Sequence, residues 1–363
     1  MSTLLDAGKL GDIDVRNRVF MAPLTRNRAH ADGTPNEIAI KYYAQRAGAG
    51  LIITEGAQIS PQGQGYVNTP GIFTAQQIDA WKKITDAVHA EGGKIVVQLW
   101  HVGRISHTSL QPGGASPLAP SAIQAKADTF TDKGVENASE PKALSLAEIE
   151  SIKEEYVRSA KLAIEAGFDG VEVHGANGYL LNQFIAKATN TRDDAYGGSV
   201  ENRARLLLET VDAVSDEIGR GRVGVRLSPT GTFNDIKDDD AEENYSYLFS
   251  EIAKRDVAYL HVVERFPGYA VTPEEVELFK SLRGKFTGNY IGNGDYDRSS
   301  ATQAVKDGAF GISFGRFFIS NPDLPERFRL NAPLAEPDPE TFYGGDEAGY
   351  SDYPTLAETL ETV

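Results

Sequence analysis

The chain has 363 residues, of which 40% are hydrophobic, and its 52 acidic residues outnumber 36 basic ones to give a formal net charge of −16. This charge excludes a bulk basic surface for nucleic acid or an acidic membrane, so we expect neither as a partner. The N-terminal residues lack the basic and apolar regions of a signal peptide, and no apolar run is long enough to span a bilayer. We therefore expect a soluble cytoplasmic protein.

The chain contains no cysteine. This absence excludes disulfides, thiolate metal sites, iron–sulfur clusters and cysteine nucleophiles. No spacing of His, Asp and Glu near the candidate site suggests a metal, so we expect none. The chemistry must come from His, Tyr, Asn or Arg side chains, or from a bound cofactor.

Short apolar runs rich in Val and Ile recur along the chain, each followed by a polar turn and a segment with helical spacing. This alternation is typical of a parallel sheet. Eight such runs lie at residues 19–23, 51–58, 94–101, 170–175, 223–229, 259–264, 289–295 and 311–318. The expected helices between them include 74–91, 146–166, 199–218, 240–255 and 299–307. The pattern predicts a single α/β domain over residues 1–363, a (β/α)₈ TIM barrel.

One connection is far longer than the usual loop between a strand and a helix. Residues 102–143 carry Pro, Gly and Ser clusters without a clear helical period, and they are too few to build a core of their own. In a barrel this segment emerges after the third strand on the carboxyl-terminal face, so we expect a cap or lid within the domain. The tail after Asn331 is also irregular, and we expect it to wrap the barrel.

Several expected strands end in polar residues, at the place where barrels of this kind carry their active sites. His174 and Asn177 can both donate a hydrogen bond to one carbonyl or nitro oxygen, which would steady negative charge on it. Tyr179 follows two residues later, and its hydroxyl is a candidate proton donor to the neighbouring carbon. A structural role for His174 is an equally good interpretation of these residues alone. Another strand ends in Gln98, Trp100 and His101.

Arg226 also ends a strand, where its guanidinium requires a carboxylate or an anionic ligand. An inter-strand salt bridge is the commoner case, and a reduced flavin with negative charge around N1 is the functional alternative. Gly292, Asn293, Gly315 and Arg316 belong to glycine-rich turns after the last two strands, where barrels bind phosphate groups. No G-x-G-x-x-G motif follows a strand, so we expect no resident NAD domain.

Six segments together resemble the old yellow enzyme family, specifically its cysteine-free branch of FMN-dependent ene-reductases with a Thr at the flavin. The segments are NRVFMAPLTR at 17–26, VQLWHVGR at 97–104, VHGANGYLLNQF at 173–184, YGGSVENR at 196–203, FGRFFISNP at 314–322 and GYSDYP at 349–354. Some relatives carry a second His where this chain has Asn177. The change keeps a hydrogen-bond donor at that position, with an expected effect on substrate preference.

The resemblance implies non-covalently bound FMN, with NADPH or NADH as the hydride donor. The reaction it implies is the reduction of activated C=C bonds in α,β-unsaturated carbonyl, maleimide or nitro compounds by a ping-pong mechanism. The family resemblance favours NADPH, and the residues themselves do not decide between the two donors.

The resemblance also assigns roles to residues. Thr25 would hydrogen-bond the flavin O4, and Gln98 and Arg226 would contact the N1, O2 and N3 edge of the ring. The full set implied to hold the cofactor is Pro23, Leu24, Thr25, Ala57, Gln98, Arg226, Gly292, Asn293, Gly315 and Arg316. The set implied to bind the substrate oxygen and donate the proton is His174, Asn177 and Tyr179. The aromatic pocket wall would be Tyr66, Trp100, Phe233 and Tyr350, although core packing is the commoner role for any single aromatic residue.

Two other functions stay open on the residues alone. A barrel lyase or isomerase acting on a phosphorylated sugar would share the phosphate site, but the strand-end Lys or acid pair typical of such enzymes is not found. The other alternative is a barrel that binds a small molecule without catalysis. Both predict a colourless protein, whereas bound flavin predicts a yellow one. The sequence leaves the choice between a monomer and a homodimer undecided.

Overall fold

The computed structural model describes residues 3–266 and 271–361. Eight parallel strands close into a barrel in the order β10-β11-β12-β13-β14-β3-β4-β5, with β5 pairing back to β10. The predicted (β/α)₈ barrel is confirmed. Its strands are β3 (Val19–Met21), β4 (Ile52–Gln58), β5 (Ile95–Trp100), β10 (Gly170–Gly175), β11 (Val223–Leu227), β12 (Tyr259–Val263), β13 (Tyr290–Asn293) and β14 (Gly311–Phe314).

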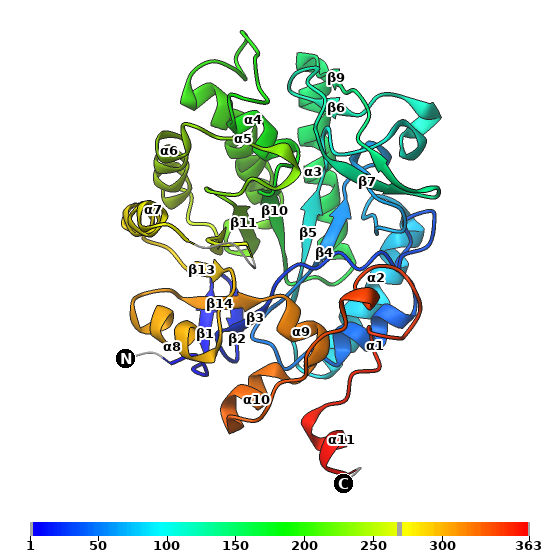
Figure 1. Cartoon of the computed structure of the whole chain (residues 1–363), viewed down its shortest axis with the longest axis vertical. Helices are drawn as coiled ribbons and strands as arrows, with labels where there is room; N and C mark the ends of the chain where they lie inside the picture. Colours follow the sequence, from blue (N-terminus) through cyan, green and yellow to red (C-terminus); the bar gives the residue numbers. More distant parts are fainter. Residues whose placement is uncertain (1–2, 267–270, 362–363) are drawn as a thin grey trace.

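Helices connect the strands and surround the barrel (Figure 1). They are α1 (Ile38–Ala44), α2 (Ala75–Ala90), α3 (Leu146–Glu165), α4 (Leu180–Ile185), α5 (Val200–Ile218), α6 (Ala241–Ala253), α7 (Pro273–Arg283), α8 (Arg298–Lys306), α9 (Arg316–Ser320), α10 (Leu324–Leu330) and α11 (Leu356–Glu361). The expected helices correspond to α2, α3, α5, α6 and α8. Within the described ranges, no helix is long and apolar enough to cross a membrane.

The last strand is shorter than expected. The run 311–318 was predicted as one strand, but β14 ends at Phe314 and helix α9 begins at Arg316. The rings of Phe314 and Phe317 lie 6.4 Å apart, a contact that follows from the helical turn between them. Arg316 therefore lies at the start of a short helix and not within a strand.

The N-terminal end of the barrel is closed by a hairpin of β1 (Gly8–Leu10) and β2 (Ile13–Val15). The hairpin is tied to the barrel because the amide of Asp12 donates to the carbonyl oxygen of Gly221 at 2.8 Å. Its apolar side chains belong to one buried cluster with barrel residues, made of Leu10, Ile13, Val15, Phe20, Leu51, Ile53, Val96, Ala258, Tyr259 and Ile291. This end of the interior is an apolar core.

Segment 102–143 holds two small sheets, β6 (Leu118–Ala119) with β9 (Lys142–Ala143), and the antiparallel hairpin β7 (Asp128–Thr131) with β8 (Gly134–Asn137). In Figure 1, β6, β7 and β9 lie together at the upper right, far from β1 and β2 at the lower left. The amide of Val67, in the loop after β4, donates to the carbonyl oxygen of Phe130 at 2.9 Å. The hairpin β7–β8 is thus joined to a loop that leaves the carboxyl end of the barrel.

Candidate active site

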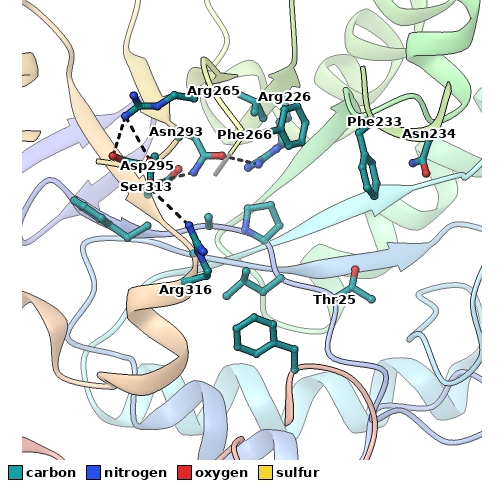
Figure 2. A pocket seen from close by; sticks show the side chains of 18 of the residues that line it. Thr25, Arg226, Phe233, Asn234, Arg265, Phe266, Asn293, Asp295, Ser313 and Arg316 are labelled. Atoms are coloured by element: carbon teal, nitrogen blue, oxygen red, sulfur yellow. Dashed lines mark hydrogen bonds and ion pairs between the residues drawn. The ribbon is translucent and has the colours of Figure 1, made fainter. Parts of the chain in front are cut away.

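A cavity of about 1320 Å³ opens at the carboxyl ends of the strands. Its wall is built from the loop after β3, the turns after β12, β13 and β14, the hairpin β7–β8, and the C-terminal segment around residues 336–343. Figure 2 shows that charged side chains gather at one side of this cavity, with Phe233 and Asn234 at the other. The two sides differ in chemistry and are described in turn.

The loop after β3 brings Pro23, Leu24 and Thr25 to the cavity wall. Its conformation is fixed from behind, because the amide of Arg26 donates to Oε2 of the buried Glu55 at 3.2 Å. Burial raises the pKa of Glu55 to about 7 despite the nearby Arg26. The side chain of Arg26 is also buried and donates to the carbonyl oxygen of Gly349 at 2.7 Å. Thr25 is therefore presented by a firmly held backbone.

The charged side of the cavity includes Asn293, Gly315 and Arg316. Arg316 and Arg265 both approach Asp295, with nitrogen-to-oxygen distances of 3.6 and 3.9 Å (Figure 2). Two partly exposed cations within reach of one carboxylate can bind an anion such as a phosphate. The sequence pattern pointed to Arg316 but not to Arg265, whose position just beyond the end of β12 was the available signal.

A glycine is required in the turn after β13. Gly294 has a φ of +133°, and a Cβ there would lie 2.4 Å from the carbonyl oxygen of Arg265. Any side chain would therefore collide with the neighbouring turn. Gly292, the glycine expected at the phosphate, lies within β13 and is not part of the cavity wall.

Arg226 reaches the cavity from β11 and is 5% exposed. Its Nη2 donates to Oδ1 of Asn293 at 2.9 Å, and its Nε has no hydrogen-bond partner among the described residues. Burial lowers the pKa of Arg226 to about 10, against the influence of the Glu172 carboxylate, so the guanidinium is charged at neutral pH. A buried cation with one free donor beside the cavity suits an anionic or electron-rich ligand edge.

Gln98 and Ala57 are close to this region but do not line the cavity. Gln98 is 3% exposed, and its Nε2 donates to Oε1 of Glu172 at 2.8 Å. Ala57 is buried on β4 beside Leu99. Their assignment to the flavin ring stays a prediction.

The opposite side of the cavity is aromatic. Tyr66 and Tyr179 line it, and their hydroxyl oxygens are 3.1 Å apart. The ring of Trp100 stacks on Tyr66 at 5.8 Å and meets Tyr179 edge-on at 5.0 Å. Burial raises the pKa of Tyr179 to about 12, so its hydroxyl keeps its proton at neutral pH. The arrangement presents a protonated phenol to whatever occupies the cavity.

His174, on β10, lies behind this phenol, with its ring 5.3 Å from that of Tyr179. Burial lowers the pKa of His174 to about 3, so the imidazole is neutral at physiological pH. Asn177 has a φ of +60°, and its backbone N–H donates to Oγ of Ser228 at 2.8 Å. Nδ1 of His174 and Oδ1 of Asn177 are buried without hydrogen-bond partners among the described residues. Neither side chain lines the cavity directly, so their joint contact with a substrate oxygen stays a prediction.

Comparison with known proteins decides the family. A sequence profile of the NADH:flavin oxidoreductase / NADH oxidase family matches residues 6–335. The chain is 46% identical over 365 residues to 12-oxophytodienoate reductase 1 of Oryza sativa subsp. japonica. The aligned region covers 99% of this chain and 94% of the relative. The protein belongs to the old yellow enzyme family of flavin-dependent oxidoreductases.

Solved structures of the family agree with this assignment. Morphinone reductase matches with a TM-score of 0.93 and 47% identity, over 98% of this chain and 97% of that one. The old yellow enzyme homologue from Zymomonas mobilis matches with a TM-score of 0.94 and 42% identity, over 98% of this chain and all of that one (100%).

The cavity fits the FMN that this family binds. FMN combines a doubly charged phosphate with a planar ring whose pyrimidine edge accepts hydrogen bonds. The two arginines near Asp295 suit the phosphate, and the unpartnered Nε of Arg226 suits the ring edge. Thr25, on the firmly held loop, lies below Phe233 and across the cavity from Arg316 (Figure 2). The donors that the group needs are present.

Two of the four predicted wall residues, Trp100 and Tyr350, do not line the cavity. Tyr350 is 1% exposed and does not line the cavity. Its ring stacks on Tyr42 at 3.9 Å, and the guanidinium groups of Arg26 and Arg28 lie 5.2 and 4.7 Å from its centroid. In this structure the ring packs between the loop after β3 and the C-terminal segment, and the role of Tyr350 in the pocket wall stays a prediction.

Of the other wall residues, Phe233 was predicted, whereas Phe266, Phe130, Tyr343 and Asn234 were not. Phe233 lines the cavity as expected, and its ring stacks at 6.1 Å on Phe266. Phe130 of the hairpin β7–β8 stacks at 6.1 Å on Tyr343 of the C-terminal segment. Asn234, next to Phe233, also lines the cavity, and its side chain lowers the pKa of Tyr179 against the larger effect of burial. Their only sequence signal was an aromatic or amide group in an irregular segment.

Proposed function

We propose that the protein reduces C=C bonds activated by a carbonyl, maleimide or nitro group, with NADPH or NADH as the hydride donor. The observation that carries this proposal is the protonated hydroxyl of Tyr179 on the cavity wall, next to the neutral His174. An alkene reductase must deliver a proton to carbon while holding the neighbouring oxygen, and these two groups supply both functions. The reductase activities in the names of two relatives, 12-oxophytodienoate reductase 1 and morphinone reductase, are consistent with it.

FMN would be held without a covalent link. The chain has no cysteine, and no histidine is distinctively placed to attach the ring. Arg316, assisted by Arg265, would bind the phosphate, and Asn293 and Gly315 would approach it through their turns. Thr25, Gln98 and Arg226 would contact the ring. When bound, FMN supplies the exchange of hydride between the nicotinamide and the alkene.

The substrate oxygen would accept hydrogen bonds from His174 and Asn177. The neutral imidazole donates one N–H, and the amide of Asn177 donates another, so the pair withdraws electron density from the conjugated alkene without a charged group. Tyr179 then transfers its phenolic proton to the carbon next to the carbonyl as negative charge grows on that carbon. The hydroxyl of Tyr66, 3.1 Å away, is placed to hydrogen-bond the phenol during this step.

The nicotinamide and the second substrate would use the same cavity in turn. No dinucleotide-binding motif offers a second site for the nicotinamide. Phe130 and Tyr343 would restrict the entrance from the cap segment 102–143 and the C-terminal segment. A ping-pong cycle follows, because the oxidised nicotinamide must leave before the alkene enters.

The test is to purify the protein and record its absorption spectrum under nitrogen. We expect a yellow protein whose flavin band is bleached by NADPH or NADH and returns on addition of 2-cyclohexenone. Heating should release FMN into the supernatant, whereas colour that stays with the precipitated chain would disprove non-covalent binding. A colourless protein that cannot take up FMN would favour a sugar-phosphate lyase or a binding barrel.

A further inference from the structure

A chain of buried polar side chains crosses the barrel interior beneath Arg226. Oε1 of Glu172 accepts from Gln98 at 2.8 Å, and Oε2 of Glu172 lies 2.8 Å from Nδ1 of His261. Nε2 of His261 lies 2.7 Å from Oγ of Ser313. Nη1 of Arg226 is 3.1 and 3.0 Å from the two nitrogens of the His261 ring. These hydrogen-bonded side chains come from strands β5, β10, β12, β14 and β11.

Glu172 and His261 are both 0% exposed, and the proposed reaction uses neither. Burial opposes ionisation of Glu172, but His261 and Arg226 hold the pKa of Glu172 below its usual value. Burial and Arg226 lower the pKa of His261 to about 4, so its ring is neutral. The interior therefore holds one carboxylate and one guanidinium, linked by a neutral imidazole.

The carboxylate determines the hydrogen-bonding direction of its neighbours. An ionised carboxylate only accepts, so Nδ1 of His261 must carry the proton, and Nε2 is left as an acceptor that faces two donors, the hydroxyl of Ser313 at 2.7 Å and Nη1 of Arg226 at 3.0 Å. For the same reason the amide of Gln98 turns its nitrogen toward Glu172 and keeps its carbonyl oxygen as an acceptor for another donor. The residues predicted to meet the flavin ring thus depend on a group that does not reach it.

We propose that Glu172 is a positioning residue for the cofactor. Through Gln98 and His261 it fixes the groups that face the pyrimidine edge of FMN, and its negative charge lowers the reduction potential of the bound cofactor. Reduction adds negative charge at that edge, which Arg226 stabilises and Glu172 opposes. This inference rests on the proposed function, because it requires FMN in the cavity.

The decisive variant is Glu172→Gln, measured as holoenzyme. The substitution keeps the size of the side chain and an acceptor for Gln98, but removes the charge and reverses the proton position on His261. We expect the ratio of the Kd for oxidised FMN to the Kd for reduced FMN to rise about tenfold. For a two-electron couple this corresponds to a midpoint potential about 30 mV higher.

Asp169, which directly precedes β10 and lies three residues before Glu172, offers a control carboxylate. Its Oδ2 lies 2.9 Å from Nε2 of His89, and its Oδ1 lies 2.8 Å from Nζ of Lys94. Asp169→Asn removes the same charge from a similar carboxylate–histidine pair, and we expect an unchanged potential. An equal shift in this variant would overturn the proposal, because net charge alone would then explain the result. The proposal would also be overturned if Glu172→Gln lost affinity equally for oxidised and reduced FMN, because that result indicates a merely structural role.

Glu172→Asp is the second variant if the Gln variant does not fold. It keeps the charge but draws the carboxylate back from His261, so we expect a smaller rise in potential in the same direction. A potential equal to that of the wild type in every folded Glu172 variant would refute the inference alone, provided that the wild type is yellow and bleached by NADPH or NADH. A wild type that binds no FMN would refute the proposed function, and the inference with it.

Discussion

The two ends of the barrel interior are built by the same strands from opposite kinds of side chain. Val96 of β5 and Tyr259 of β12 belong to the apolar cluster under the hairpin β1–β2. Two residues further along each strand, Gln98 and His261 belong to the buried polar chain. Alternate residues of a strand face the same side, so one strand serves both ends.

The difference between the apolar end and the polar end separates the residues that stabilise the fold from those that serve the chemistry. Burying apolar surface stabilises the fold, whereas a buried carboxylate and guanidinium give little net stability after their loss of water. We infer that the apolar end holds the barrel closed, while the polar end is kept for the ligand that it faces. Variants at one end should therefore change properties that variants at the other leave alone.

The largest effect is expected at the apolar end. Phe20 is 0% exposed and stacks on Phe310 with ring centroids 6.3 Å apart. Phe20→Ala leaves a cavity and should lower the free energy of unfolding by about 3–5 kcal/mol, measured by urea denaturation. The potential of bound FMN should match that of the wild type while the variant is folded. A shifted potential would break the proposed division between the two ends.

The next effect concerns the substrate oxygen at the polar end. His174→Ala combined with Asn177→Ala should slow reoxidation of the reduced enzyme by 2-cyclohexenone on the order of 10²-fold or more, because two donors to the developing charge are lost. FMN should stay bound, and phenolic ligands should bind more weakly. Unchanged turnover would disprove the assignment, and loss of flavin would instead assign these residues a structural role.

Most of the barrel was predictable because its signals are local. The strands are short Val- and Ile-rich runs, and helices such as α3 and α5 carry an apolar face that a sequence reveals. The boundary of β14 was wrong because the three Phe residues of Phe314–Phe318, set around Gly315 and Arg316, suit a buried strand and a buried helix alike.

The site was predictable where a strand end fixes the position of a residue, as for Thr25, Tyr179, Arg226 and Arg316, which all line the cavity. Residues from irregular segments were predicted only where the family resemblance named them, as for Tyr66 and Phe233, because long-range packing decides where such residues go. The placement of Tyr350 followed from its motif alone and missed its stacking on Tyr42. Glu172 lies mid-strand, where a single inward-facing acid gives no sign of its partner on β12.

A smaller effect is expected from the proton donor. Tyr179→Phe should leave the rate of flavin reduction by NADPH nearly intact, because that step needs no proton. Reoxidation by 2-cyclohexenone should slow about tenfold, less than the full contribution of a general acid because water can replace the hydroxyl. Stopped-flow measurement of both half-reactions checks this, with a quinone as control since its reduction needs no proton on carbon. Equal slowing in both halves would contradict the role.

The smallest effect is an expected absence of titration. The pKa of His174 is lowered to about 3 and that of Tyr179 is raised to about 12. A lowered pKa leaves the imidazole neutral as pH rises above it, and a raised pKa keeps the phenol protonated as pH rises toward it. His174 and Tyr179 should thus cause no change in the rate of reoxidation at saturating 2-cyclohexenone between pH 5 and 9, a range in which the flavin and Glu55, with its pKa of about 7, can still titrate. If the rate changed near pH 6.5 in the wild type but not in His174→Ala, the imidazole of His174 would titrate at its ordinary pKa, and the prediction would be wrong.

The claim that one cavity at the polar end serves both substrates is tested most directly by competition in the first half-reaction. Oxidised enzyme is mixed under nitrogen with NADPH below saturation and increasing concentrations of a phenolic ligand, which cannot reoxidise the flavin, and bleaching of the flavin is followed by stopped flow. We predict that the phenol lowers the observed bleaching rate competitively, so that a higher NADPH concentration restores it. A bleaching rate independent of phenol concentration, at concentrations that inhibit reoxidation by 2-cyclohexenone, would show two separate sites and contradict the account.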